Sequence, residues 1–199
     1  MPCGTDAEYP DGRAGGAVST QIAFIRGINV GTAKRVAMAD LREMLTGLGY
    51  TDVRTLLNSG NAIFGATDSV AAVTAAIEKG LADDLGVPAK VLVRTRAQVE
   101  KALAADPIGE LATDGAKHFL GFLVEKPTRK TVEEIAALTN GADWAPDIAR
   151  LVDDHLYLWC PNGISNATFA KVSWDKKLGI AMTMRNWNTL TKLVALAPD

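Results

Sequence analysis

The sequence contains few of the residues from which metal centres and disulfide frameworks are built. Among 199 residues it has two cysteines, Cys3 and Cys160, and two histidines, His118 and His155. Two cysteines cannot form a disulfide framework or a structural zinc site, and neither histidine stands at metal-ligand spacing. We therefore expect no metal and no cofactor, and a reducing cytoplasm as the location of the protein.

Long apolar runs and an excess of one charge are also missing. No stretch approaches the roughly 20 apolar residues that span a bilayer. The N-terminus lacks the basic and then apolar pattern of a signal peptide. Lys and Arg together number 21 against 23 Asp and Glu, which leaves no basic field for duplex DNA or a membrane surface. These absences favour a globular protein without a membrane partner.

Residues 1–20 are rich in Gly, Pro and Asp and show no hydrophobic period. Too little apolar surface is available there to offset the entropy of ordering, so we predict a disordered tail. The packed body should then begin near Gln21.

From Gln21 onward, two halves of the chain show the same order of patterns. In the first half, "QIAFIR" predicts a strand, and apolar residues at helical spacing follow from Met38 to Leu48. "VRTLLNSGNAIF" predicts two strands with a tight turn at Asn58–Asn61. A second helix, the strand "AKVLVR" and a helix capped by Thr95 complete the half.

The second half repeats this course with "KHFLGFLV", a helix near residues 131–138, a hairpin turning at Asp153–Asp154, a helix within residues 165–178 and "IAMTMR". Its ending "MRNWNTLTKLVA" aligns with "VRTRAQVEKALA", which matches Arg94 with Arg185. We predict an α+β fold of two ferredoxin-like βαββαβ units, each followed by a short helix. The units cover residues 21–105 and 116–199, with the boundary in the Pro-, Gly- and Asp-containing stretch 106–115.

Both faces of "IAFI", "FLGFLV" and "LYLW" are apolar, although a ferredoxin-like sheet carries helices on only one face. The partner unit or a second chain should therefore cover the other face. The sequence leaves a monomer and a homodimer open.

The predicted topology brings polar residues together at one edge of the first sheet. The first and second strands run the same way, so the loop after "FIR" meets the turn between the second and third strands. This edge then holds cations, amides, flexible glycine backbone and a helix N-terminus, which together suit a phosphate or carboxylate. The same residues are also typical of turns that bind no ligand, and Arg26 is also suited to capping carbonyl groups or to pairing with an acidic side chain.

Three stretches resemble the DUF1697 family of uncharacterised bacterial proteins: "AFIRGINVGTAKRVAMADLREMLTGLGYTDVRTLLNSGNAIF", "LYLWCPNGI" and "RNWNTLTKL". The resemblance covers nearly all of the chain after residue 20. It implies an α/β protein but supplies no activity, cofactor or catalytic residue. The positions that match the family pattern are Arg26, Gly27, Asn29, Val30, Gly31, Met38, Leu41, Ser59, Gly60, Asn61, Arg185, Asn186, Trp187, Asn188, Thr189 and Lys192. Thr32 and residues 56–58 depart from this pattern.

The stretch "RNWNTLTKL" is a second group of polar residues. Asn186 or Asn188 should cap the last helix, and Arg185, Asn188 and Lys192 are candidates for a second wall of the anion site. The predicted ligand-binding residues are Arg26, Gly27, Asn29, Gly31, Lys34, Ser59, Gly60, Asn61, Arg185, Asn188 and Lys192.

The sequence shows few signatures of catalysis. Ser59 lies outside a GxSxG motif, and Cys160 has no CxxC partner and is expected to be a buried thiol. A module that binds a small anion, such as a nucleotide, therefore ranks first. Two alternatives remain: a single-stranded nucleic-acid binder that stacks bases on Phe24 and Phe64, and an enzyme acting on a phosphorylated or nucleotide substrate.

Overall fold

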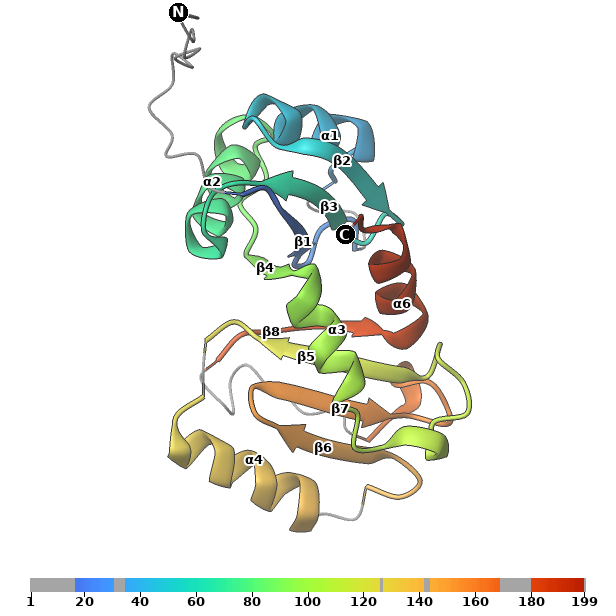
Figure 1. Ribbon diagram of the computed structural model, residues 1–199. Coiled ribbons are helices and arrows are strands. Elements are labelled where there is room, and N and C mark those ends of the chain that lie inside the picture. Colours follow the sequence, from blue (N-terminus) through green and yellow to red (C-terminus); the bar gives the residue numbers. More distant parts are fainter. Residues whose placement is uncertain (1–16, 31–34, 126, 142–143, 169–179, 199) are drawn as a thin grey trace, which may run out of the picture.

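The computed structural model describes residues 17–30, 35–125, 127–141, 144–168 and 180–198 (Figure 1). The predicted tail falls mainly on residues 1–16, which lie outside the described residues. The first strand begins at Ser19, two residues earlier than the sequence pattern indicates.

The first unit has the element order βαββαβ. Its sheet has the strand order β2-β3-β1-β4, and every neighbouring pair is antiparallel. This is the arrangement of a ferredoxin-like unit, as predicted. The elements are β1 (Ser19–Ile25), α1 (Met38–Gly47), β2 (Thr51–Leu56), β3 (Asn61–Ala66), α2 (Val70–Asp83) and β4 (Val91–Thr95).

The second unit repeats this sheet with the order β6-β7-β5-β8, again antiparallel throughout. Most of the helix expected within residues 165–178 lies outside the described residues, which show a 3-10 turn at Ile164–Asn166. The elements of this unit are β5 (His118–Leu123), α4 (Arg129–Gly141), β6 (Ile148–Val152), β7 (His155–Trp159) and β8 (Met182–Asn186).

The outer face of each sheet is covered by helices of its own unit (Figure 1). On the first sheet, Leu41 and Leu45 of α1 and Ile77 of α2 pack in one buried cluster with Ile25 and Phe64. On the second, Ile135 of α4 belongs to the cluster beneath that sheet. Helical spacing of apolar residues in these segments explains both contacts.

The inner faces of the two sheets form a shared core. Helices α3 (Arg96–Ala104) and α6 (Trp187–Leu196) lie between the sheets (Figure 1). Their buried side chains join Phe24 and Phe122, whose rings stack with centroids 5.2 Å apart. Of the two possibilities expected for the second face, the partner unit or a second chain, the described residues show the partner unit there.

The helices that follow the two units begin in the same way. Thr95 accepts a hydrogen bond from the backbone of Gln98 at α3, and Asn186 accepts one from Thr189 at α6. Asn186, of the two predicted candidates, is therefore the cap. Among the described residues, no helix has the length and apolar character needed to cross a membrane.

Candidate functional site

The two units contact each other through two arginines at equivalent positions. Arg94 on β4 lies opposite Ile22 of β1, and Arg185 on β8 lies opposite Leu120 of β5. Each guanidinium group reaches across to the other unit. We call the contact of Arg185 with Ile25, Ser59 and Asn61 the amide junction. We call the contact of Arg94 with Leu123, Asp154 and His155 the acidic junction.

At the amide junction, Arg185 donates hydrogen bonds to several neutral acceptors of the first unit. Its Nε atom lies 2.5 Å from Oδ1 of Asn61, and one terminal nitrogen lies 3.1 Å from the carbonyl of Ile25 and 3.0 Å from that of Ser59. The other terminal nitrogen donates to Met184 at 2.9 Å. The guanidinium thereby ties the end of β1 to the hairpin between β2 and β3.

No described carboxylate pairs with this cation. Burial alone lowers the pKa of Arg185 to about 10, because desolvation disfavours the charged form and no nearby acid opposes it. The guanidinium carbon also lies 5.7 Å from the centre of the Phe24 ring, within reach of a cation–π interaction. Among the described residues, the positive charge at the amide junction is therefore balanced by dipoles alone.

Asn61 is fully buried at the start of β3 and is held by bonds in three directions. Its amide nitrogen donates to the carbonyl of Leu56 and to the hydroxyl of Ser59, both at 3.0 Å, while its oxygen accepts from Arg185. The turn itself spans Leu57–Gly60 rather than the predicted Asn58–Asn61, since Asn61 already belongs to the strand.

Asn29 fastens the loop after β1 to this hairpin. Its amide nitrogen donates to the carbonyls of Val36 and Asn58, and its oxygen accepts from the backbone of Val36. Asn29 adopts a φ of 56°, a left-handed conformation that asparagine tolerates better than most residues. Because Val36 directly precedes Ala37, the N-cap position of α1, these hydrogen bonds place the start of α1 beside the hairpin.

The start of α1 has no side-chain cap. Ala37 occupies the N-cap position and makes no side-chain cap hydrogen bond. Free N–H groups at a helix start favour a negative charge nearby. Asp40, in the first turn of α1, already supplies part of this negative charge.

Glycine is required at one position of the hairpin. Gly60 has a φ of 78°, and an added Cβ would lie 2.9 Å from the side chain of Ile28 and 3.0 Å from Cβ of Ile25. Gly27 also has a positive φ, 68°, but an added Cβ would meet nothing within 4 Å. The close approach of Gly60 to Ile28 lets the hairpin close over the end of β1.

Two apolar side chains are exposed beside these polar groups. Val30 is 72% exposed in the loop after β1, and Leu57 is 58% exposed at the hairpin. Leu57 also has a φ of 59°, which is unusual for a bulky residue. Strained backbone of this kind is concentrated at ligand-binding sites.

Described contacts bring together five of the predicted ligand-binding residues: Asn29, Ser59, Gly60, Asn61 and Arg185. Arg26 and Gly27 follow Ile25 in the same loop, and the backbone of Arg26 donates to the carbonyl of Lys90. Gly31 and Lys34 lie outside the described residues. Asn188 is placed elsewhere, since its backbone donates to Gly115 at 3.3 Å, and Lys192 is exposed on α6. Neither has a described contact with the amide junction.

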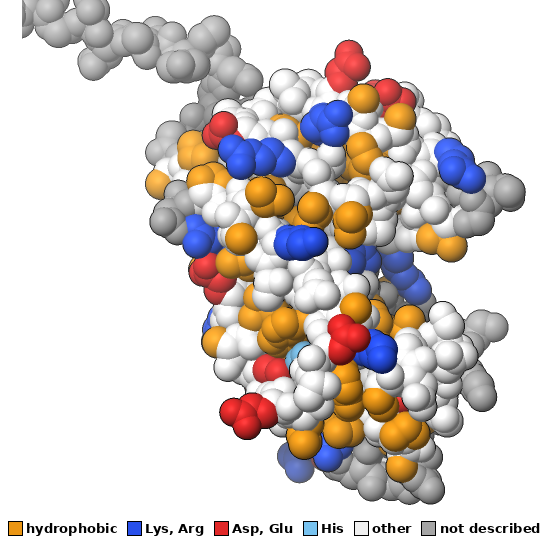
Figure 2. All heavy atoms as spheres, turned by 90° about the vertical axis from the view of Figure 1, so that its right-hand side faces the viewer, with side chains coloured by type: hydrophobic (Ala, Val, Ile, Leu, Met, Phe, Trp, Pro, Cys, Tyr) orange, Lys and Arg blue, Asp and Glu red, His pale blue; other side chains and the backbone are white. Residues whose placement is uncertain are grey.

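Figure 2 shows a hollow at the right-hand edge of the molecule, between its upper and lower parts, with Lys or Arg side chains visible inside it. The hollow lies at the height where the two units meet in Figure 1. The surface between the units is thus indented and basic on this side.

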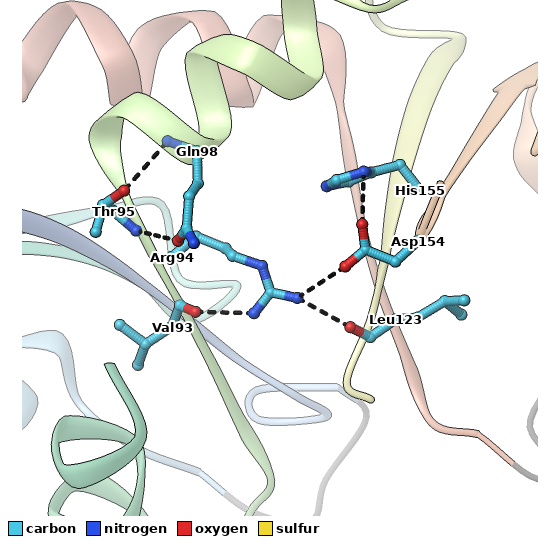
Figure 3. Close-up of polar contacts among 7 residues, drawn as sticks. All are labelled: Val93, Arg94, Thr95, Gln98, Leu123, Asp154 and His155. Carbon is cyan, nitrogen blue, oxygen red and sulfur yellow. Dashed lines mark hydrogen bonds and ion pairs between the residues drawn. The ribbon is translucent and has the colours of Figure 1, made fainter. Parts of the chain in front are cut away.

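The acidic junction has the same plan but a different charge (Figure 3). Arg94 donates to the carbonyls of Val93 and Leu123, both at 3.0 Å, as Arg185 donates to Met184 and Ile25. It also lies 3.8 Å from Oδ2 of Asp154, so this cation has an acidic partner. Burial lowers the pKa of Arg94, and the charge of Asp154 opposes the shift.

Sequence reasoning did not identify the acidic junction as a site. Asp153 and Asp154 form the predicted turn between β6 and β7, and this assignment is correct. The available signal was the internal alignment of Arg94 with Arg185, which places this turn where the first unit has Ser59. A turn that looks unremarkable locally is therefore opposite a buried arginine of the other unit.

Other candidate side chains are placed in the core. Phe24 and Phe64 are buried on opposite faces of the first sheet, and the Cys160 thiol is buried as expected. His118 is 3% exposed and stacks on Trp187, with Nε2 3.4 Å from Asp106 but not in hydrogen-bonding geometry. In the part of the chain that the structure describes, no three His, Cys, Asp or Glu residues are grouped as metal ligands.

Comparisons with known proteins agree with this fold. The model of the family described as "Protein of unknown function (DUF1697)" matches residues 18–157. A solved structure of the conserved bacterial protein SP0830 from Streptococcus pneumoniae is similar, with a TM-score of 0.70 and 24% sequence identity. The similarity covers 90% of this chain and 99% of that one. A search of curated proteins finds no match.

Proposed function

The chain belongs to the DUF1697 family, and we propose that it binds a small anionic ligand at the amide junction. The ligand carries a phosphate or carboxylate group. The residues proposed to surround this group are Arg26, Gly27, Ser59 and Gly60, with Arg185 behind them as a fixed source of positive charge.

The observation that carries the proposal is the unpaired charge of Arg185. All of its described partners are carbonyl or amide oxygens, whereas the equivalent Arg94 faces Asp154. A half-buried cation without a described acid partner raises the local affinity for an anion because its surroundings screen the charge less than water does. Asn29 and Asn61 supply rigidity, since their polar atoms are occupied by the loop itself.

The exposed side chains of Val30 and Leu57 support a ligand that has an apolar or aromatic part beside its anionic group. A nucleotide has both features. The start of α1, which lacks a side-chain cap, adds N–H groups near the hairpin. These observations favour a nucleotide over a bare inorganic anion.

The alternative of single-stranded nucleic acid stacked on the sheet has no comparable support. Phe24 and Phe64 are 0% and 1% exposed, so neither ring is available to a base. The enzyme alternative also gains no specific observation at the amide junction, because none of its described residues is a general base. We expect the protein to act in the cytoplasm, as a monomer or homodimer.

Calorimetric titration of the full chain with AMP and with inorganic pyrophosphate tests the proposal. Arg26→Met should weaken AMP binding about tenfold or more, because a charge-assisted hydrogen bond contributes about 1.5–3 kcal/mol. Ser59→Ala should weaken it less, since a neutral hydrogen bond contributes about 0.5–1.5 kcal/mol. Arg129→Met is the matched control, because Arg129 is exposed on α4.

AMP should bind more tightly than pyrophosphate if the apolar rim takes part. The proposal is wrong if neither probe binds, or if Arg26→Met and Arg129→Met bind AMP equally well. Backbone amide shifts of Gly27, Ser59 and Gly60 on titration would locate the bound probe independently of the variants.

A further inference from the structure

A pocket lies at the acidic junction, away from the site proposed above. It has a volume of about 200 Å³ and lies between α3 and the hairpin of β6 and β7. Drug-sized ligands occupy pockets of roughly 300–1,000 Å³, so this one suits a smaller metabolite. Its charged or polar lining residues are Arg94, Gln98, Lys101, Asp153, Asp154, His155 and Tyr157, and the Tyr157 hydroxyl already donates to the carbonyl of Ala102.

Two hydrogen-bond donors in this lining have no described acceptor. The Oε1 atom of Gln98 accepts from the backbone of Thr95, which fixes the amide and leaves its NH₂ group free (Figure 3). Lys101, one turn further along α3, forms no described ion pair or hydrogen bond. Arg94 differs, because the carbonyls of Val93 and Leu123 and the carboxylate of Asp154 already hold it. The free donors therefore lie on α3.

The hairpin supplies a free acceptor opposite them. Nδ1 of His155 lies 3.1 Å from Oδ1 of Asp154, which favours the tautomer with its proton on Nδ1 (Figure 3). Nε2 then carries the lone pair, and it has no described partner. Burial lowers the pKa of His155. The negative charges of Asp154 and Asp153 act to raise this pKa, whereas the positive charges of Arg94 and Lys101 lower it further. The imidazole is thus neutral near pH 7 and able to accept a hydrogen bond.

We propose that this pocket binds a small carboxylate that also carries a hydroxyl or ammonium group. The carboxylate lies against Lys101 and the NH₂ group of Gln98, and the hydroxyl or ammonium group donates to Nε2 of His155. The ring of His155 is held for this contact by Asp154 and by its edge-on packing against Phe122, with centroids 5.3 Å apart.

The two histidines of the chain give a direct assay. In the full chain without a histidine tag, NMR resolves two imidazoles, and buried His118 serves as an internal reference. Titration with L-lactate should shift the His155 signals in a saturable manner and leave His118 unchanged. Propionate lacks the donor and lactamide lacks the charge, so each should bind several-fold more weakly than lactate.

Lys101→Met should weaken lactate binding about tenfold, as expected for loss of a charge-assisted hydrogen bond. Lys130→Met, at an exposed lysine of α4, is the control and should leave it unchanged. The proposal is overturned if lactate leaves His155 unperturbed, if propionate or lactamide binds equally well, or if the two lysine variants behave alike. Since AMP at the amide junction should not shift His155, failure of one proposal is distinguishable from failure of the other.

Discussion

Replacing Arg185 with methionine should destabilise the protein by about 2–3 kcal/mol. The change removes the donors to Oδ1 of Asn61 and to the carbonyl of Ile25, both of which belong to buried residues. Each unsatisfied buried acceptor costs about 1–3 kcal/mol. The carbonyl of Ser59 belongs to an exposed residue, so water replaces that bond. Removing a half-buried cation, whose burial is itself unfavourable, offsets part of the loss.

Urea unfolding of the full chain, followed by tryptophan fluorescence, measures this change. Arg150→Met is the control, because Arg150 is exposed on β6 and donates only to the neighbouring Ala149 among the described residues. It should change the free energy of unfolding by no more than about 0.5 kcal/mol.

A double-mutant cycle between Arg185→Met and Asn61→Ala should give a coupling energy of about 1–3 kcal/mol. Arg185→Lys should recover little stability, because an ammonium group cannot reach acceptors on two sides as the planar guanidinium does. Equal stability of Arg185→Met and Arg150→Met would refute the argument that Arg185 holds the units together.

Three further outcomes follow from the described contacts. Gly60→Ala should cost about 2 kcal/mol in urea unfolding and Gly27→Ala about 1 kcal/mol, because only the first adds a clash to its positive φ; equal costs would contradict the crowding described at Ile28. Burial lowers the pKa of His118 and His155, so the unfolded chain binds more protons than the folded one. The free energy of unfolding should therefore fall as the pH drops below about 6.5. If His118→Gln left the slope of the unfolding free energy against pH unchanged in this range, the result would argue against this reasoning. Burial raises the pKa of Tyr157 and of Cys160 to about 12, so the free energy of unfolding should decrease as the pH rises from about 9 to 12. In unfolding measured against pH, Cys160→Ala should remove the part of this decrease that begins near pH 9.

The sequence predicted the elements and the order of strands in each sheet because both depend on local patterns and general rules. Alternating and helical apolar spacing indicated the elements, and the crossover rule gave the convergence of the loop after β1 with the first hairpin. The contact of Asn29 with Asn58 confirms that convergence.

The contacts of individual side chains were harder to predict from the sequence. Arg26 and Arg185 look alike in sequence, and it is Arg185 that binds the carbonyls of Ile25 and Ser59. A backbone carbonyl has the same chemistry in every residue, so no sequence pattern marks it as an acceptor. The positions of Asn188 and Lys192 depend on how the inner faces of the two sheets pack, and that packing is set by non-local apolar contacts.

The two arginine contacts occupy equivalent positions, but because they lie in one chain their partner residues can differ. In a symmetric dimer of one-unit chains, each substitution would appear at both contacts, because identical subunits share one sequence. Joining the units in one chain removes that restriction. Asp154 can then face Arg94 while Asn61 faces Arg185, and each contact is free to acquire its own charge. A chain with two similar units thus holds two copies of one geometry whose contacting residues can differ.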